Sequence, residues 1–416
     1  MKLFFITLTS AYVILRIIFT FLDKKGGKTP AKEELALKYF TEDDIKKAKE
    51  YHDRGFGASI ARKIISFIFP LAFFFSGFSM FLSNLISPLS FGYLTLQAIL
   101  FILCYFVLEF LINLPFSYYF SFSLEHKFGF SNMTLKEWLI YTLKQFSVGA
   151  VINMVIISAA YITLRKAGAN WIWFIPVVLL AFELIFTFLY PYIILPLFYK
   201  KSNFEQGEYT APIFEVAKRS GIKLKKLFQI NESKYSKHTN AFFTGFGPEK
   251  SIYIFDTLVK NNTPEEVASV VAHEAGHWKH HHVLKGIALG FFGSFVIAYL
   301  ISLTFFEFAN GLNISNIAGL PLLSFILTIF TFFTTPIDSF ISRKMEVTAD
   351  TYELRSTGKR EVFISSMVRL AKDNKSYLYT DDFLTFWFAS HPPMLERIKM
   401  AIEFDFGKTT DTLENK

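Results

Sequence analysis

The chain has 416 residues, of which 52% are hydrophobic, and it carries a formal net charge of +8. Its mean hydropathy is +0.35. Ordinary soluble domains are about 45 to 50% apolar, so the hydrophobic content and the hydropathy together exclude a single domain of that kind. The positive charge does not indicate nucleic-acid binding, since Lys and Arg lie mainly in loops beside apolar blocks and no recognition module is present. The single cysteine, Cys104, excludes an intrachain disulfide and a thiolate metal site.

Apolar blocks of about 20 residues recur along the chain, and this is the length that a helix needs to cross a bilayer. The first block, 1–22, lacks a small-residue cleavage site and is predicted to be a retained membrane helix. The polar stretch that follows shows helical spacing over 31–40 and 43–51, which predicts two surface helices. The later apolar blocks cover 64–86, 91–114, 138–164, 171–198, 287–306 and 320–341. We therefore expect a mainly α-helical integral membrane protein with about seven transmembrane helices.

The polar stretches divide the chain into four regions. We expect five transmembrane helices and a cytoplasmic helical loop (23–62) in 1–198, the first part of a polar domain in 199–284, helices six and seven in 285–341, and the rest of the polar domain in 342–416. Lys and Arg are concentrated in the loop 23–62, in 115–137 and after 198. Because basic loops stay in the cytoplasm, we predict that the N-terminus lies outside and that both parts of the polar domain face the cytoplasm.

The segment that begins at Thr263 carries the candidate metal site. Thr263 and Glu266 have the spacing of a capping box, which predicts that a helix begins there. His273 and His277 are four residues apart, so both imidazoles lie on one face of that helix, as a tetrahedral zinc requires. Glu274 lies beside them and is the predicted general base.

A catalytic zinc needs a third protein ligand and an open position for water. Glu346, directly after the last apolar block, is the candidate, and Asp350 is expected to hydrogen-bond a ligating imidazole. The alternative for these two carboxylates is an exposed helix start. Three further histidines, His280, His281 and His282, are interpreted as a solvated, membrane-proximal cluster, with a weak inhibitory or regulatory zinc site as the alternative.

A strand is predicted just before the metal-binding helix. Residues 251–256 are rich in β-forming side chains. We expect this strand at the edge of a sheet, where an extended substrate can pair with it through main-chain hydrogen bonds.

Further motifs are spread over nearly the whole chain. They are Leu114-Pro-Phe-Ser, Glu125-His-Lys-Phe-Gly129-Phe, Pro196-Leu-Phe, Ser236-Lys-His-Thr-Asn240-Ala-Phe-Phe-Thr-Gly-Phe-Gly247, Phe255-Asp-Thr-Leu258 and Ser390-His391-Pro with Leu395-Glu-Arg397. Together with the motifs around His273 and Glu346, they resemble the type I CaaX prenyl proteases. That family consists of multi-spanning zinc metalloendopeptidases of the gluzincin type, to which the heat-shock protease HtpX is more distantly related.

The resemblance implies more than the spacing of residues can. It implies a chamber enclosed by the transmembrane helices, with a small α+β zinc protease domain at the cytoplasmic face. It also implies that Asn240 binds the substrate backbone and that His391 and Arg397 contact the substrate or the tetrahedral oxyanion. The implied reaction is removal of the C-terminal tripeptide of prenylated proteins, with one zinc ion as cofactor. The implied location is the inner membrane of a bacterium or the endoplasmic reticulum membrane of a eukaryote.

Two other functions stay open at this point. Nothing in the sequence identifies a prenyl-binding pocket, so a quality-control endopeptidase without prenyl specificity is an alternative. A zinc-containing membrane scaffold or transporter is a second alternative, although structural zinc sites are usually closed by four ligands rich in Cys. The expected partners are a polypeptide substrate, prenylated or membrane-associated, and the lipid bilayer, but no nucleic acid.

Overall fold

The computed structural model describes residues 1–205, 207–244 and 249–407. The chain is mainly α-helical and forms two compact units. The first unit consists of Met1–Phe21, Arg54–Tyr190 and Leu284–Thr335. The second unit consists of Leu22–Asp53, Pro191–Val283 and Pro336–Lys416, and it contains all the predicted site residues.

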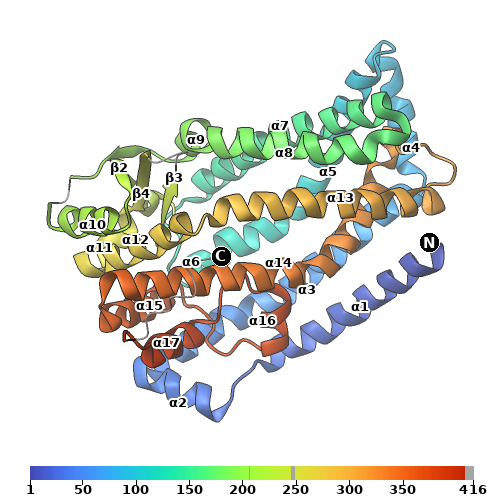
Figure 1. Ribbon diagram of the computed structural model, residues 1–416. Coiled ribbons are helices and arrows are strands. Elements are labelled where there is room, and N and C mark those ends of the chain that lie inside the picture. Colours follow the sequence, from blue (N-terminus) through green and yellow to red (C-terminus); the bar gives the residue numbers. More distant parts are fainter. Residues whose placement is uncertain (206, 245–248, 408–416) are drawn as a thin grey trace. The chain divides into compact units, whose positions relative to one another are not determined.

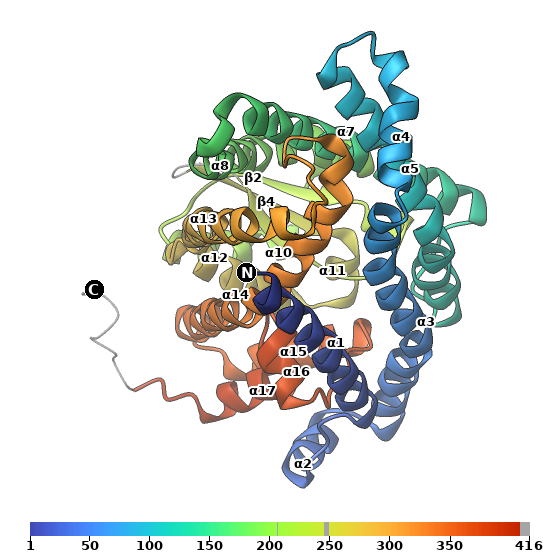
Figure 2. The ribbon, with the colours of Figure 1, turned by 90° about the vertical axis from the view of Figure 1, so that its right-hand side faces the viewer.

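Long hydrophobic helices form the first unit (Figures 1 and 2). They are α1 (Lys2–Lys25), α3 (Glu42–Phe75), α5 (Leu94–Tyr118), α7 (Leu135–Ala167), α8 (Trp171–Leu189), α13 (His282–Phe308) and α14 (Leu320–Thr357), of which α1, α3, α13 and α14 also contribute residues to the second unit. Two shorter helices, α4 (Phe78–Ile86) and the three-residue α6 (Glu125–Lys127), also belong to the first unit. Short 3-10 and π-helical turns lie between or after them: η1 (Ser87–Ser90), η2 (Tyr119–Leu124), η3 (Gly168–Asn170), η4 (Tyr190–Ile194) and η6 (Ile317–Gly319).

Six helical stretches of the described chain are long and apolar enough to cross a membrane. One of them, Leu135–Phe198, contains both α7 and α8, which are joined by the turn η3 and pack side by side. Counting these two helices separately gives the expected number of about seven spans, so the predicted fold class is confirmed.

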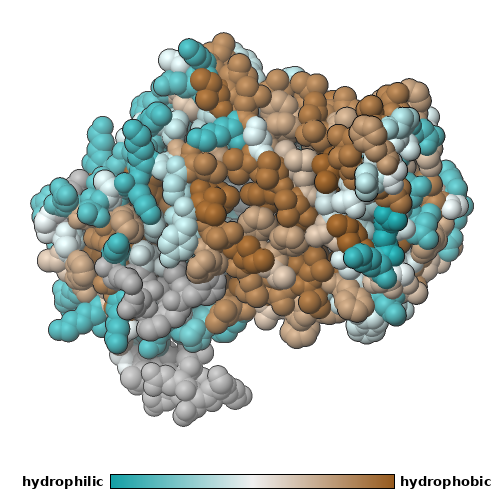
Figure 3. Space-filling model, turned by 90° about the horizontal axis from the view of Figure 1, so that it is seen from above, coloured by the Kyte–Doolittle hydropathy of each residue, from teal (hydrophilic) through white to brown (hydrophobic). Residues whose placement is uncertain are grey.

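The helices α7 and α8 expose many large hydrophobic side chains. These include Leu139, Ile140, Leu143, Val151, Val155, Trp173, Phe174, Val177, Ile185 and Phe188. Figure 3 shows a face of the molecule on which hydrophobic residues gather over a broad area. Soluble monomers rarely expose continuous apolar patches larger than a few hundred Å². This surface is therefore suited to contact with lipid.

The helix α3 differs from the sequence-based expectation, because it runs without a break from Glu42 to Phe75. The predicted surface helix at 43–51 and the predicted span from 64 onward are one element rather than two. The residues between them include Gly55 and Gly57 but no proline. A glycine costs a helix only about 1 kcal/mol relative to alanine, so these two do not end it.

A four-stranded sheet lies in the second unit. Its strands are β1 (Lys201–Asn203), β2 (Lys223–Ile230), β3 (Ala241–Thr244) and β4 (Glu249–Phe255), arranged in the order β1-β2-β4-β3. The strand predicted at 251–256 is present as β4, but its predicted edge position is wrong. It pairs in parallel with β2 and antiparallel with β3, so β3 forms the edge. Ile252, Tyr253 and Ile254 are all buried, as is typical of an interior strand covered on both faces.

Helices cover the sheet and complete the second unit (Figure 1). They are α2 (Pro30–Tyr39), α9 (Leu195–Phe198), α10 (Gly207–Arg219), η5 (Glu232–Lys234), α11 (Asp256–Asn261), α12 (Pro264–Lys279), α15 (Arg360–Asp373), α16 (Asp382–Phe388) and α17 (Met394–Glu403). One core joins the sheet to α10, α11 and α12. A second core joins α2, α15, α17 and the C-terminal part of α14. These two cores position the elements that carry the candidate site.

Candidate active site

The helix α12 begins as the sequence predicts. The Thr263 hydroxyl accepts a hydrogen bond from the Glu266 backbone N–H at 3.3 Å, and a Glu266 carboxylate oxygen accepts one from the Thr263 N–H at 2.8 Å. Val267 and Val271 are fully buried in the core against the sheet. The capping box and this apolar face fix both the start and the rotation of α12, and thus the direction in which its histidines point.

Three candidate ligand atoms converge from α12 and α14. The Nε2 atoms of His273 and His277 lie 3.1 Å apart. Glu346 brings Oε2 within 3.3 Å of His273 Nε2 and Oε1 within 3.3 Å of His277 Nε2. The structure therefore brings together the three residues that the sequence singles out as a metal site.

This arrangement fits a tetrahedral metal ion. Zinc at about 2.0 to 2.2 Å from nitrogen and oxygen ligands requires ligand atoms about 3.3 to 3.6 Å from one another, and the distances among His273, His277 and Glu346 are 3.1 to 3.3 Å. Among the described residues, no donor is oriented to hydrogen-bond the buried Oε2 atom of Glu346. A cation would satisfy that oxygen.

The two ligand-bearing helices approach closely at Gly276. A β-carbon at this glycine would lie 2.9 Å from Ala349 Cα and 3.1 Å from Tyr352 Cβ. Glu346 is one turn before Ala349 on α14, and it is 5% exposed in the interior of that helix. The alternative of an exposed helix start is therefore wrong, and the short contact at Gly276 explains how Glu346 reaches the histidines.

Asp350 and Arg397 lie on the other side of His273. The Asp350 Oδ1 atom is 2.8 Å from His273 Nδ1, and Asp350 Oδ2 accepts a hydrogen bond from Arg397 Nε at 2.8 Å. Burial disfavours the charged imidazolium, but the neighbouring carboxylates of Asp350 and Glu346 outweigh burial and raise the pKa of His273 to about 10. Asp350 thus orients the ring with Nε2 toward Glu346, which is the function of a carboxylate behind a metal-bound histidine.

Arg397 is largely buried, and its contacts in the structure are with Asp350 and His273. Its side chain is 10% exposed, and its guanidinium forms two hydrogen bonds to Asp350. Its Nη2 atom is 3.5 Å from His273 Nδ1. The predicted contact of Arg397 with substrate or oxyanion stays a prediction.

Glu353 extends this buried network. It is fully buried, its Oε2 lies 3.8 Å from His273 Nδ1, and its Oε1 accepts a hydrogen bond from the Ser269 hydroxyl. His273, Asp350 and Glu353 could also hold a metal ion by geometry alone. The Arg397 cation already pairs with Asp350 there, and all three residues of this group are buried, which disfavours access of water. The group with Glu346 is therefore the better candidate.

His282 corrects the interpretation of the three histidines after the motif. Only His281 is exposed, whereas His282 is buried, with Nδ1 2.9 Å from His277 Nδ1. This contact leaves His277 Nε2 for the metal. The sequence could not show it, because α12 ends at Lys279 and His281 takes a positive φ of 54° that turns His282 back toward α12.

Glu274, the predicted general base, follows His273 directly on α12 and is partly buried. Burial raises the pKa of its carboxyl, while the positive charges of His273 and His277 oppose that shift. A bound divalent cation would favour the carboxylate further. The carboxylate is the form that accepts a proton, so the histidines and a bound cation favour the form of Glu274 that a general base requires.

His391 approaches Glu346 from the solvent side. Its Nε2 lies 3.3 Å from Glu346 Oε1, and its side chain is 61% exposed. Its Nδ1 lies 2.8 Å from the Ser390 hydroxyl. If that hydroxyl donates to Nδ1, Nε2 carries the proton and can donate it to an oxygen near the metal. Ser390 belongs to a motif of the sequence, but only the structure shows this contact.

Asn240 lies at the start of the edge strand β3. Its side-chain Oδ1 accepts a hydrogen bond from the Ala241 N–H at 2.8 Å, and its carbonyl accepts one from Phe255 N–H at 3.1 Å. Asn240 is exposed, so it is accessible to a ligand beside β3. The end of its motif, 245–247, lies outside the described residues.

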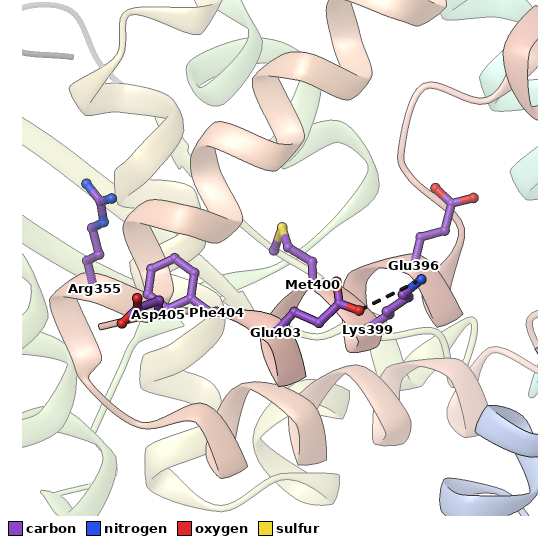
Figure 4. Close-up of a pocket in the computed structure, with 7 residues that line it drawn as sticks. All are labelled: Arg355, Glu396, Lys399, Met400, Glu403, Phe404 and Asp405. Atoms are coloured by element: carbon purple, nitrogen blue, oxygen red, sulfur yellow. Dashed lines mark ion pairs between the residues drawn. The ribbon is translucent and has the colours of Figure 1, made fainter. Parts of the chain in front are cut away.

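A cavity of about 540 Å³ lies on α17, apart from these residues (Figure 4). It is lined by Arg355, Glu396, Lys399, Met400, Glu403, Phe404 and Asp405, with an ion pair of 3.8 Å between Lys399 and Glu403. None of the predicted site residues lines it.

Comparisons with known protein families match most of the chain. Residues 204–404 match the family described as peptidase family M48. Residues 22–200 match the family described as CAAX prenyl protease N-terminal, five membrane helices. The first match includes the entire candidate site.

Individual proteins similar to this chain carry names that agree with these family matches. The chain is 34% identical over 302 residues to the probable CAAX prenyl protease 1 of Schizosaccharomyces pombe, covering 71% of this chain and 63% of that relative. It is 30% identical over 309 residues to CAAX prenyl protease 1 of Saccharomyces cerevisiae, covering 69% of this chain and 68% of the relative. It is also 27% identical to the crystal structure of S. mikatae Ste24p, with a TM-score of 0.81 over 95% of this chain and 98% of that one.

Proposed function

Because this chain belongs to peptidase family M48 and is a homologue of the CAAX prenyl proteases, we propose that it is a membrane-embedded zinc metalloendopeptidase that removes the C-terminal tripeptide of prenylated proteins. The observation that carries this proposal is the convergence of His273, His277 and Glu346 on one point, with Glu274 next to His273 in the sequence of α12. Three ligands leave one position for water, which is typical of a catalytic rather than a structural zinc.

The proposed chemistry assigns a role to each side chain. Zinc held by His273, His277 and Glu346 would lower the pKa of a bound water to about 7. Glu274 accepts the proton of the attacking water and delivers it to the leaving amine. His391 Nε2 donates a hydrogen bond to the oxyanion, an interaction that contributes about 2.7 to 4 kcal/mol per donor in other hydrolases.

The substrate backbone is proposed to lie along β3. Within the described part of the chain, β3 pairs only with β4, so its other side can accept an extended peptide. Asn240 at the start of β3 would hold the peptide in register. This assignment replaces the one made for residues 251–256, since β4 is already paired on both sides.

The proposed orientation places the second unit in the cytoplasm and the N-terminus outside. The basic loops of the sequence support this orientation. Reporters fused within the 207–244 segment and at the C-terminus should both report the cytoplasm, because Glu346 has to meet His273 on one side of the membrane. Opposite readings would contradict the metal site itself. The proposed membrane is the inner membrane if the source is bacterial and the endoplasmic reticulum if it is eukaryotic.

The variant Glu274→Gln tests the catalytic assignment. It keeps the size of the side chain and leaves the ligands in place, so zinc should stay bound while the base is lost. Since a general base contributes about 10² to 10⁴ in rate, cleavage should fall by about that factor. The detergent-solubilised protein is offered a farnesylated CaaX peptide, the same peptide without the prenyl group, and an unfolded membrane protein.

The three substrates separate the possible functions. Faster cleavage of the farnesylated peptide, abolished by Glu274→Gln and by a chelator, supports the prenyl protease. Preference for the unfolded protein supports the quality-control endopeptidase instead. Equal cleavage by the wild type and Glu274→Gln would show that Glu274 is not the base, and a zinc-loaded protein that cleaves none of the three would favour the scaffold.

A further inference from the structure

The second unit's part of α14 presents a single stripe of polar side chains. Ser339, Arg343, Glu346 and Asp350 are separated by four, three and four residues, so they lie along one face of the helix. Glu346 and Asp350 belong to the site described above. The two earlier members, Ser339 and Arg343, instead contact α16.

Arg343 holds the carboxyl end of α16 (Asp382–Phe388). Its Nη1 donates hydrogen bonds to the carbonyl oxygens of Thr385 at 2.7 Å and Ala389 at 2.6 Å, and its Nη2 donates to that of Phe386 at 3.3 Å. The last carbonyls of a helix lack partners within the helix and favour a nearby cation. Arg343 thus fixes the backbone where α16 ends.

Ser339 supports the same end of α16 from one turn earlier. Its hydroxyl donates to the Trp387 carbonyl at 3.1 Å. Two donors from one face of α14 therefore hold α16 in a defined rotation. Of these two residues, Arg343 is the one that donates a hydrogen bond to the carbonyl of Ala389.

The residues after Ala389 are Ser390 and His391. The Ala389 carbonyl and the Ser390 N–H belong to the same planar peptide group, so the hydrogen bond from Arg343 orients the start of this dipeptide. The His391 side chain is 61% exposed, and its Nε2 lies 3.3 Å from Glu346 Oε1. Because surrounding side chains do not enclose the ring, its position depends on the backbone that carries it.

We propose that Arg343 is a positioning residue of the hydrolytic reaction, which holds His391 at a fixed place beside the ligand Glu346 by anchoring the end of α16. The proposal rests on the proposed function, in that His391 acts on the oxyanion. One helix, α14, then supplies the metal ligand and, one turn earlier, the anchor of the histidine. An arginine suits this role because its planar fork of donors reaches three carbonyls, whereas a lysine ammonium is a single point charge.

A double-mutant cycle tests this assignment. Arg343→Ala, His391→Ala and the double variant are compared on the best substrate found with wild-type protein. We expect Arg343→Ala to lower kcat by about 10- to 100-fold with little change in KM or zinc content, since a displacement of about 1 Å can cost a factor of 100. In the His391→Ala background, Arg343→Ala should cause no further loss. Arg343→Lys should recover part of the rate.

Arg369 provides a matched control. It also donates to a backbone carbonyl, that of Asn261 at 2.6 Å, and pairs with Glu266, but it lies on α15 and contacts the end of α11 rather than that of α16. The losses from Arg369→Ala and His391→Ala should multiply, as expected of independent sites. If the losses from Arg343→Ala and His391→Ala multiply in the same way, or if Arg343→Ala leaves kcat unchanged, the proposal is wrong.

Hydrogen exchange gives a readout that does not depend on activity. Amides in the peptide that covers 385–392 should exchange faster in Arg343→Ala than in wild type, and Arg369→Ala should leave that peptide unchanged. Unaltered exchange in Arg343→Ala would overturn the anchoring role. Faster exchange combined with a Glu274→Gln variant that retains full cleavage would leave the anchor standing and reject the proposed function.

Discussion

The Cα atom of Ala349 lies 2.9 Å from the place that a β-carbon on Gly276 would occupy. This distance is shorter than real β-carbon contacts allow, so the two backbones are as close as a glycine permits. Any side chain at Gly276 has to push α12 and α14 apart, and these helices carry the three proposed ligands.

We therefore predict that Gly276→Ala weakens zinc binding by at least tenfold, while the secondary structure is retained. A shift of a few tenths of an ångström is large for ligands whose distances to the metal vary by about 0.2 Å. Zinc affinity measured by competition with a chelator checks this. The control is Gly286→Ala, because a β-carbon there meets nothing within 4 Å. Wild-type affinity in Gly276→Ala would contradict the prediction.

The two candidate metal groups can be separated by their carboxylates. We expect Glu346→Ala to lose the zinc and Glu353→Gln to keep it, because Glu346 meets both His273 and His277, whereas Asp350 of the other group is already paired with Arg397. Both residues lie on α14 and both are buried, so the two variants are matched in location. Metal analysis of the purified proteins is the measurement. Loss of zinc from Glu353→Gln alone would instead assign the metal to the group of His273, Asp350 and Glu353.

Asp350 and Arg397 should behave as a coupled pair. Asp350→Asn leaves the buried Arg397 guanidinium without its counter-ion, and breaking such a pair costs about 3 to 5 kcal/mol. Replacing both residues, as Asp350→Asn with Arg397→Met, should recover much of the stability.

Zinc affinity should not recover in that double variant, because the partner of His273 Nδ1 is altered and such losses cost about 10- to 100-fold. Thermal unfolding and zinc titration of the same samples give the two readouts. Recovery of both stability and affinity would show that Asp350 acts only through Arg397.

We predict that the stability of the folded protein depends on pH because of the buried carboxyl of Glu232. It is 7% exposed, its Oε2 meets no hydrogen-bond donor in the described part of the chain, and burial raises its pKa from 4.5 to about 7. The folded protein therefore binds more protons than the unfolded chain between these two values. Stability falls as pH rises through this window and levels off above pH 7.

The variant Glu232→Gln should not show this fall in stability with rising pH, because its side chain has no proton to lose. It should unfold at a higher temperature than the wild type at pH 8, with a difference that shrinks toward pH 5, where both are neutral at this position. One pKa unit corresponds to about 1.4 kcal/mol. Asp256→Asn is a useful control, since Asp256 is close by but accepts hydrogen bonds from Ser233. A constant difference between pH 5 and pH 8 would mean that Glu232 does not titrate in this range.

The helical elements could be predicted where the pattern is local. Hydrophobic blocks of bilayer length and the capping box at Thr263 depend only on neighbouring residues, and both kinds of feature are present in the structure. The continuity of α3 could not be predicted from its mixed composition. In a sequence, a polar helical stretch and an apolar one look like separate elements, even when no helix-breaking residue lies between them.

Contacts between distant segments explain most of what the sequence did not reveal. The edge position of β3 depends on the order of the strands in the sheet, and the sequence of a four-residue strand does not predict that order. His282 turns back onto His277 because of the positive φ at His281, a conformation that no local pattern predicts. The link between Arg343 and Ala389 joins positions 46 apart in the chain, and an isolated arginine gives no sign of such a partner.

The continuous course of α14 also limits how this chain can vary in length. Each residue of an α-helix turns its successor by about 100° and advances it by about 1.5 Å. One inserted residue between Ser339 and Asp350 would therefore rotate the polar side chains before it out of phase with those after it, even if every side chain were retained. Deletions in that interval would act in the same way. Homologous chains should accordingly show substitutions there but no gaps, and their differences in length should lie in the loops, where a change of register leaves the spacing of 339, 343, 346 and 350 intact.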